Sequence, residues 1–147
     1  MRRLAYLLVS ITITYACECG PSSYYTFEEE FCKRDYVTHA KVLDKSDFYV
    51  YGHPGFKYAI EYITIYKMPK ALSELANTLY SLSPSEDCGL ELDPGKEYLL
   101  SGVIVLDGEV QLLTPCEAEV GLLKQWDQVS AAEEYKLSTL ECVDQLT

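Results

Sequence analysis

The sequence predicts a small, mainly β domain with short helices near both ends, in which the strands close into a barrel. Several segments alternate apolar and polar residues at the two-residue period of a strand, and turn signals separate them. Two further segments carry the spacing or the capping pattern of a short helix. Six cysteines, an even number, favour a domain that three disulfides hold together.

The first 16 residues have the three parts of a secretory signal peptide. Two arginines give a positive start, Leu4–Ile13 is apolar, and Ala16 is a small residue at the cleavage site. The apolar run is too short to cross a bilayer, which needs about 20 residues. We therefore expect residues 1–16 to be removed, residues 17–147 to form a single domain, and the protein to be secreted and extracellular. A structural N-terminal strand is the alternative.

The N-terminal half of the domain is expected to contain one helix and two strands. Two phenylalanines four residues apart share one helix face, so Phe27–Lys33 is predicted to be a short helix. Tyr36–Leu43 alternates and is predicted to be a strand. The Gly-His-Pro-Gly sequence that begins at Gly52 is a strong turn signal. It leads into Tyr58–Tyr66, in which every second residue contributes to one tyrosine-rich face of a strand.

The C-terminal half adds two strands and a helix. Ala71–Leu82 is ambiguous between helix and strand. Tyr98–Leu106 is predicted to be a strand, and the Asp-Gly pair that follows predicts a hairpin turn into Val110–Thr114. A Ser-Ala-Ala-Glu capping box at Ser130 predicts a helix that ends near Leu140. Five strands in Greek-key order with flanking helices would form a barrel of the oligonucleotide/oligosaccharide-binding (OB) type.

The charge of the chain excludes two classes of partner. The sequence has 12 basic and 23 acidic residues. Two basic residues leave with the leader, so 10 remain and the net charge of the mature chain is −13. Binding to nucleic acid or to an anionic membrane surface needs a basic footprint. We therefore expect neither nucleic-acid binding nor membrane insertion.

The residues assemble into no catalytic constellation, so we do not expect an enzyme. His39 lies in a predicted strand and His53 in a predicted turn, and neither belongs to a zinc-binding His-Glu-x-x-His pattern. No cysteine is expected to be free as a nucleophile or metal ligand. Glu28, Glu29 and Glu30 are consecutive on a helix and point in different directions, which indicates a solvated face. The 13 tyrosines indicate packing and interface area, so we interpret the protein as a binder.

The most informative feature is the Cys-Glu-Cys sequence at residues 17–19, directly after the expected cleavage site. A mature chain that begins on Cys17 has a free α-amino group close to its first carbonyl oxygen. These two atoms can close a five-membered chelate on a metal ion, and a disulfide on Cys17 would hold the chelate rigid. Cys17 and Cys19 are not expected to pair with each other, because the ring would be strained. Spacing leaves the other pairings open.

These residues resemble the tissue inhibitors of metalloproteinases, within the wider class of netrin-like (NTR) domains. The resemblance covers essentially the whole mature chain and begins with Cys-Glu-Cys-Gly-Pro at residues 17–21. The other matching segments are Phe31-Cys32, Ala40–Val42, Tyr51–Pro54, Cys88-Gly89, Leu92-Asp93, Gly95–Gly102, Cys116, Trp126-Asp127 and Cys142. Six cysteines in this register with an initial Cys-x-Cys make a specific signal. The resemblance implies a five-stranded, OB-fold-like barrel of the netrin-like type.

The resemblance also implies a disulfide pairing and a mechanism. The family joins its first cysteine to the fourth, its second to the fifth and its third to the sixth. Carried over, the pairs are Cys17–Cys88, Cys19–Cys116 and Cys32–Cys142. In the family, the mature N-terminal cysteine displaces the water on the catalytic zinc of a protease and binds the metal through its α-amino nitrogen and carbonyl oxygen. Here Cys17 would contact that zinc, and the chain would need no cofactor of its own.

The protease-binding surface that the resemblance implies has two parts. The first is the N-terminal segment, Cys17, Glu18, Cys19, Gly20 and Pro21. The second, which would flank it and fill the other side of the cleft, is Glu86, Asp87, Cys88 and Gly89. Loops around Phe48–Pro54 would add peripheral contacts. The implied partners are extracellular zinc metalloproteinases, and we expect the inhibitor to be a monomer.

The sequence departs from the family pattern in two places. Glu18 stands where family members usually carry Ser or Thr, at the position whose side chain points into the main specificity pocket. An unpartnered carboxylate in an apolar pocket costs several kcal/mol, whereas a pocket with a basic floor would accept it. The sequence also stops five residues after Cys142, so we expect the inhibitory domain alone, without the second domain of full-length members.

Two other functions stay open beside protease inhibition. A netrin-like module that inhibits no protease could bind a growth factor, a receptor or a matrix protein, and Glu18 favours this alternative. The initial Cys-x-Cys favours the inhibitor, because most other netrin-like modules do not begin with it. A structural disulfide scaffold or a secreted enzyme is the third alternative.

Overall fold

The computed structural model describes residues 19, 26–86, 88–105 and 110–142. The fold of these residues is mainly β with a few helices, as the sequence predicts. Their strands are β1 (Tyr36–Val50), β2 (His53–Lys67), β3 (Thr78–Leu82), β4 (Glu97–Val105), β5 (Val110–Leu112) and β6 (Lys124–Gln125). Their helices are α1 (Phe27–Lys33), α2 (Cys116–Glu119), the 3-10 helix η2 (Trp126–Gln128) and α3 (Ala131–Thr139). None of the helices in the described ranges has the length and apolar character needed to cross a membrane.

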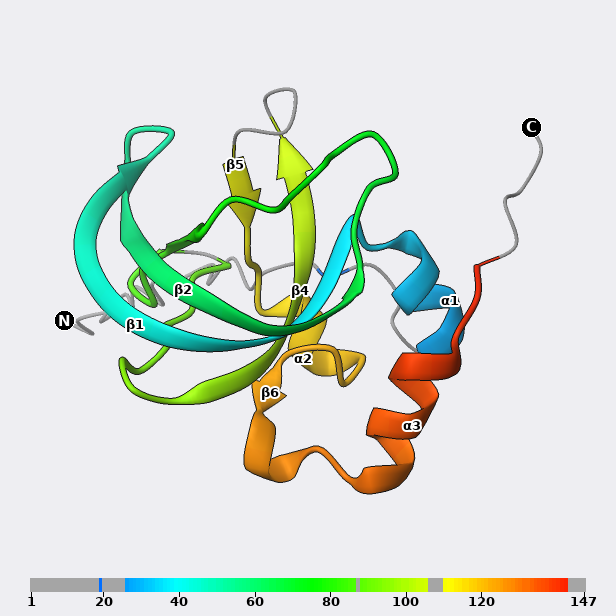
Figure 1. The fold of residues 1–147 in the computed structure, drawn as a ribbon. Helices are drawn as coiled ribbons and strands as arrows, with labels where there is room; N and C mark the ends of the chain where they lie inside the picture. Colours follow the sequence, from blue (N-terminus) through cyan, green and yellow to red (C-terminus); the bar gives the residue numbers. More distant parts are fainter. Residues whose placement is uncertain (1–18, 20–25, 87, 106–109, 143–147) are drawn as a thin grey trace, which may run out of the picture.

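Five of the strands, β1 to β5, are paired into a closed ring, whose arrangement can be followed in Figure 1. β1 pairs antiparallel with β2 and with β4, β2 pairs antiparallel with β3, and β4 pairs antiparallel with β5. The parallel pairing of β3 with β5 completes the ring. β3 lies in the segment that the sequence left ambiguous, where residues 78–82 are a strand and residues 71–77 form neither helix nor strand. Because the pairing of β3 with β2 and β5 decides its conformation, the local sequence pattern could not predict it.

β1 and β2 form one long hairpin whose turn comes earlier than predicted. Tyr51 and Gly52 connect the strands, and both have positive φ angles, 52° and 84°. Two such residues give the turn whose twist matches the flanking strands. The predicted four-residue turn is therefore right only at Gly52, because the three residues that follow, His53–Gly55, lie within β2. Gly55 is required by a close approach, since a Cβ there would lie 2.4 Å from the carbonyl oxygen of Ser81 on β3.

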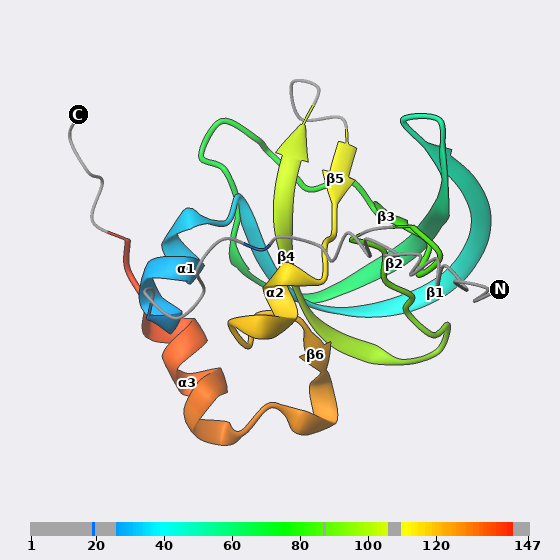
Figure 2. The ribbon, with the colours of Figure 1, turned by 180° about the vertical axis from the view of Figure 1, so that it is seen from behind.

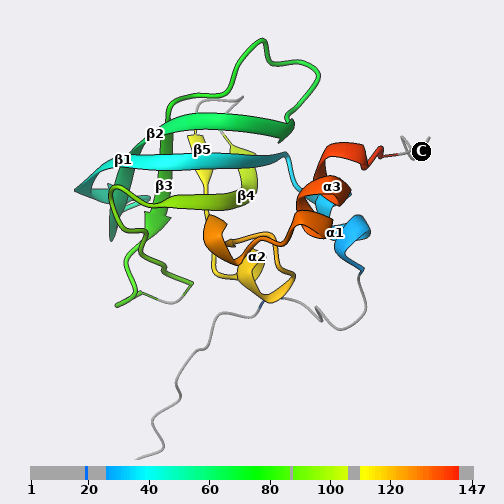
Figure 3. The same cartoon turned by 60° about the horizontal axis from the view of Figure 1, so that its bottom comes forward.

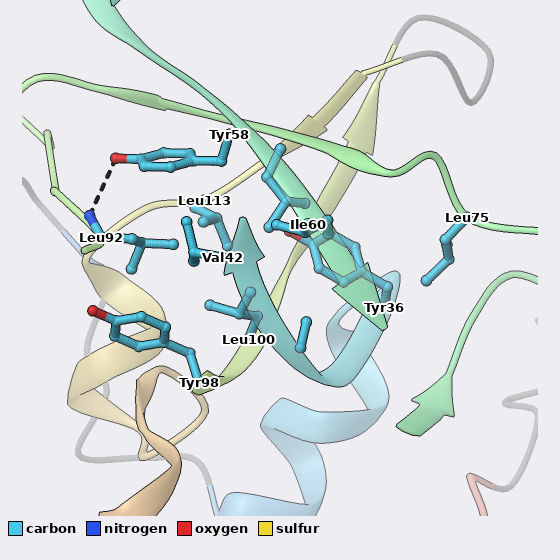
Figure 4. Packing of buried hydrophobic residues seen from close by; sticks show 11 residues of the cluster. Tyr36, Val42, Tyr58, Ile60, Leu75, Leu92, Tyr98, Leu100 and Leu113 are labelled. Atoms are coloured by element: carbon cyan, nitrogen blue, oxygen red, sulfur yellow. Dashed lines mark hydrogen bonds between the residues drawn. The ribbon is translucent and has the colours of Figure 1, made fainter. Parts of the chain in front are cut away.

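Apolar side chains from all around the ring fill its interior (Figure 4). On β2, Tyr58 and Ile60 are buried while the residue after each, Ala59 and Glu61, is exposed, which confirms the first part of the predicted period-two face. The predicted face does not continue to Thr64, which is exposed. The Tyr58 hydroxyl accepts a hydrogen bond of 3.2 Å from the amide of Leu92, shown as a dashed line in Figure 4. The cluster consists of Tyr36, Ala40, Val42, Tyr58, Ile60, Leu75, Leu79, Leu92, Tyr98, Leu100 and Leu113.

A second apolar cluster joins the helices to the ring. Phe31 of α1 and Leu137 of α3 pack with Val37 of β1, Leu99 of β4 and Leu122. Figures 2 and 3 show α1 and α3 side by side at one end of the molecule. The two helices are thus fixed to β1 and β4 by a core separate from the one inside the ring.

The helices near the two ends confirm the sequence predictions. α1 has the predicted bounds and begins with a capping box, in which Thr26 accepts a hydrogen bond of 3.2 Å from the amide of Glu29. α3 begins at the predicted capping box, where Ser130 accepts a bond of 3.3 Å from the amide of Glu133. α2 and η2 were not predicted, because three or four residues are too few to show a helical period. The predicted Asp-Gly turn between β4 and β5 lies outside the described residues.

Candidate functional site

Cys19 is attached to α2 by a disulfide. It pairs with Cys116, the first residue of the helix, with 5.3 Å between their Cα atoms. The bridge spans 97 residues of sequence, so it fixes the N-terminal part of the chain to α2 in its C-terminal half. This is one of the three pairings that the family resemblance implies.

The second implied pairing is also present, and the third falls partly outside the described residues. Cys32 of α1 pairs with Cys142, which lies just beyond α3, with 5.5 Å between their Cα atoms. Cys88 is disulfide-bonded too. Its predicted partner, Cys17, lies outside the described residues.

Glu86, Cys88 and Gly89 lie in a compact turn after β3, which we call the 83–90 loop. Ser83 opens the loop, and its amide donates a hydrogen bond of 3.0 Å to the carbonyl oxygen of Pro54 on β2. Within the loop, the amide of Glu86 donates to Ser83 at 2.9 Å, and the amide of Gly89 donates to Glu86 at 3.2 Å. These bonds fold the loop back on itself and fix both of its ends to the sheet.

The backbone of the 83–90 loop restricts which residues fit at positions 88 and 89. Cys88 has a positive φ angle of 64°, a conformation that residues other than glycine adopt at a cost of about 1 kcal/mol or more. At Gly89, a Cβ would lie 1.7 Å from the carbonyl oxygen of Ser83, so no other residue fits without moving the loop. Geometry therefore explains the glycine at position 89, whereas Cys88 takes a strained conformation that cysteine does not favour.

The tip of the β1–β2 hairpin lies next to the 83–90 loop. His53 Nδ1 at the start of β2 is 3.3 Å from the Glu86 carboxylate. The tip also carries three exposed aromatic side chains, Phe48, Tyr49 and Tyr51, with exposed fractions of 43%, 70% and 63%. Hairpin tip and loop thus form one continuous surface with apolar and acidic character.

The predicted site residues divide into two groups in the structure. The described ones are Cys19, attached to α2, and Glu86, Cys88 and Gly89, held together in the 83–90 loop. The others, Cys17, Glu18, Gly20, Pro21 and Asp87, lie outside the described residues. The described part of the predicted site therefore consists of Cys19 on α2 and the 83–90 loop.

The residues considered for metal binding or catalysis have structural partners instead. His39 packs against Trp126, and its Nε2 lies 2.9 Å from Glu97. Glu28 pairs with Lys136 of α3, Glu29 caps α1, and Glu30 pairs with Arg34, so the three glutamates point to different neighbours. The predicted solvated face is wrong for Glu30, which is buried beside Arg34. Within the described part of the chain, no group of three or more His, Cys, Asp or Glu side chains could hold a metal ion.

The sequence analysis missed one pair of residues beside the cysteine anchors. The Arg34 guanidinium pairs with the buried carboxylate of Glu117 on α2, with 3.1 Å between Nη1 and Oε1. Glu117 directly follows Cys116, so this ion pair lies next to the attachment point of Cys19. No local sequence signal could have found it, because the partners come from opposite ends of the domain.

Comparisons with known proteins agree with the arrangement of the cysteines. Residues 15–142 match the family model "Tissue inhibitor of metalloproteinase". The chain is 26% identical to "Putative metalloproteinase inhibitor tag-225" of Caenorhabditis elegans, over 95% of this chain and 96% of that protein. It is 35% identical to the "Tissue inhibitor of metalloproteinase" of Drosophila melanogaster, over 67% of this chain and 48% of that protein. The match thus spans nearly the whole nematode relative and about half of the fly relative.

Proposed function

Because the chain belongs to the tissue inhibitor of metalloproteinase family, a family of inhibitors rather than enzymes, we propose that it is a secreted inhibitor of zinc metalloendopeptidases. Metalloproteinase inhibition in general follows from the family. The way in which this chain inhibits, its targets and its secretion are our proposal.

The proposed mechanism is direct chelation of the protease's zinc by the N-terminal residue. After removal of residues 1–16, the α-amino nitrogen and carbonyl oxygen of Cys17 would bind the zinc in place of its water. A catalytic zinc keeps one position open for water or substrate, so a bidentate ligand at that position blocks the reaction. The amine must be deprotonated to bind, as ligands of a metal ion generally must be. Cys17 then supplies only backbone atoms, and its side chain serves to hold them.

Two disulfide attachments near the predicted inhibitory segment, residues 17–21, support this mechanism. Cys19 forms a disulfide with Cys116 on α2. Cys88, which lies in the folded 83–90 loop, is also disulfide-bonded. An inhibitory segment held in place before binding loses little conformational entropy in the complex, which raises its affinity. Beside this segment, the protease's active-site cleft would be contacted by Glu86, Asp87, Cys88 and Gly89. The exposed aromatic residues of the hairpin tip would add peripheral contacts.

The rest of the proposal concerns the scaffold. We infer that the closed five-stranded ring is an OB-fold-like Greek-key barrel of the netrin-like type. We also infer that residues 17–147 form one domain and that the inhibitor acts as a monomer in the extracellular space. The two disulfides and the two apolar clusters support a rigid domain.

Glu18 favours a second candidate function. Its carboxylate would enter the main specificity pocket of a bound protease, and burial without a partner in an apolar pocket costs several kcal/mol. A netrin-like module that binds an extracellular growth factor, receptor or matrix protein would not meet this cost. A protease whose pocket has a basic floor would not impose it either, so Glu18 also predicts a narrow target range.

The single observation that carries the proposal is the family match over residues 15–142, which includes all six cysteines. The test is a titration of the secreted chain, with its N-terminus confirmed by mass spectrometry, against zinc metalloproteinases with apolar and with basic specificity pockets. Stoichiometric inhibition of at least one enzyme, preferentially one with a basic pocket, is expected. A folded chain that inhibits none of them would favour the second candidate.

A further inference from the structure

α2, which carries the disulfide to Cys19 of the proposed inhibitory segment, is attached to the domain without a buried apolar side chain of its own. α2 has four residues, and its one buried residue is charged: Glu117 is 1% exposed. A helix of one turn has no stability of its own in water. The chain on either side of α2 is anchored by the buried Leu113 and Leu122. Since α2 itself buries no apolar side chain, its orientation between these anchors depends on polar contacts and on the Cys19–Cys116 disulfide.

Both carboxylate oxygens of Glu117 are engaged. Oε2 accepts hydrogen bonds from the amide and the hydroxyl of Thr114, at 3.1 and 2.7 Å, which ties α2 to the segment just before it. Oε1 pairs with Nη1 of Arg34 at 3.1 Å. The backbone oxygen of Glu117 accepts a bond of 2.8 Å from Leu122, which is in the second apolar cluster. Glu117 thus connects α2 to Thr114, to Arg34 and to Leu122.

Arg34 is itself held rigidly at the end of α1. Its Nη2 pairs with Glu30 at 2.7 Å, and its side chain is 18% exposed. The next residue, Asp35, donates its amide to Gly102 on β4 at 3.0 Å and accepts a bond of 2.7 Å from the amide of Ile104. Arg34 therefore starts from a fixed point on the core and extends to α2.

We propose that the Arg34–Glu117 ion pair is a positioning element of the inhibitor, which orients α2 and, through Cys116, the Cys19 end of the inhibitory segment. This inference rests on the proposed function. The pair is not proposed to touch the protease or its zinc. Without it the disulfide stays closed, but α2 samples many orientations, and binding must then order Cys19 and its neighbours again at a cost in affinity.

The first test compares two variants that each remove a buried or half-buried ion pair. Glu117→Gln keeps an oxygen for Thr114 but loses the charge that pairs with Arg34. The matched control, Glu133→Gln, removes the 2.5 Å pair with Lys124 that ties α3 to β6 and does not touch α2. Both variants should lower the melting temperature, whereas only Glu117→Gln should weaken inhibition, by about tenfold. Unchanged inhibition by folded Glu117→Gln, or equal weakening in both variants, would overturn the proposal.

The second test needs no protease. Amide hydrogen exchange of residues 116–122 should become faster in Glu117→Gln and stay as in the wild type in Glu133→Gln. If Glu117→Gln does not fold, Arg34→Lys is measured instead, because lysine keeps the charge but cannot bridge two carboxylates as the guanidinium fork does. Unchanged exchange in α2 would refute the positioning role. A wild-type chain that inhibits no protease would refute the proposed function alone, since the exchange result stands by itself.

Discussion

The imidazole ring of His39 stacks on the indole ring of Trp126, with their centroids 3.6 Å apart and their planes inclined by 7°. The Nε2 atom of His39 is 2.9 Å from the carboxylate of Glu97, and the residue is 7% exposed. The stack joins β1 to η2, and the contact with Glu97 joins β1 to β4. One ring face and one nitrogen of His39 are thus occupied by the protein, which gives this histidine a packing role.

Replacing His39 by alanine should therefore destabilise the domain. The variant loses the stack, the contact with Glu97 and buried volume, for which we expect a loss of about 2–3 kcal/mol in the free energy of unfolding. The control is His53→Ala, because 63% of that side chain is exposed and its loss should stay within about 0.5 kcal/mol. Urea unfolding followed by circular dichroism measures both, and equal losses would contradict the packing role.

The pH dependence of stability should include a contribution from Glu133. A hydrogen bond from Lys124 and one from the amide of Ser130 lower the pKa of Glu133 from 4.5 to about 2. A carboxyl group whose pKa is lower in the folded than in the unfolded state stabilises the fold at neutral pH. That stabilisation is lost as the pH falls from 4.5 to about 2.

In this range the wild type should lose about 1 kcal/mol more than Glu133→Gln, an amount reduced because solvent screens a group that is 35% exposed. Unfolding free energies measured from pH 7 to pH 2 test the prediction. Parallel curves for the two proteins would show that the Lys124–Glu133 pair does not contribute.

Gly89→Ala should weaken inhibition by more than its loss of stability explains. The new Cβ would lie 1.7 Å from the carbonyl oxygen of Ser83, so the 83–90 loop must open around Cys88. Gly95→Ala is the control, because Gly95 has a φ of 83° but open space around its Cα. Both changes should cost about 1 kcal/mol or more of stability. Inhibition constants should rise for Gly89→Ala only. An equal rise in both variants would show that the 83–90 loop is not part of the protease-binding surface.

Inhibition itself should weaken as the pH falls, because the zinc-binding amine of Cys17 must be neutral. A free α-amino group has a pKa of about 7.7–8.0, so the inhibition constant should rise about tenfold per pH unit below about pH 7. The measurement uses one protease over pH 6–8, corrected for the change in its own activity. A flat profile would argue that another group occupies the zinc.

The sequence was most informative where local chemistry decides the structure. The bounds of α1 and the start of α3 follow from the spacing of two phenylalanines and from a Ser-Ala-Ala-Glu capping box. The burial of Tyr58 and Ile60 on β2 follows from the period of two. The pairing of Cys19 with Cys116 and of Cys32 with Cys142 came only from the family resemblance, because spacing alone allows many pairings.

The sequence was least informative where distant segments decide the structure. Gly55 has the sequence context of a turn, but its lack of a side chain serves the close approach of β3. β3 is a strand because it pairs with two neighbours, and α2 is fixed by Arg34, a residue 83 positions before Glu117 in the printed sequence. Of the predicted site, Glu86, Cys88 and Gly89 are found together in one loop. The role of Cys17 in zinc binding stays a prediction.

The most direct test of the central claim is the effect of one added residue at the N-terminus. The chain that begins with Cys17, confirmed by mass spectrometry, is compared with the same chain carrying a single alanine before Cys17. Both should have the same melting temperature and the same circular dichroism spectrum. If the α-amino nitrogen of Cys17 binds the protease's zinc, the first chain inhibits stoichiometrically and the extended chain does not inhibit. Equal inhibition by the two chains would contradict the chelation mechanism.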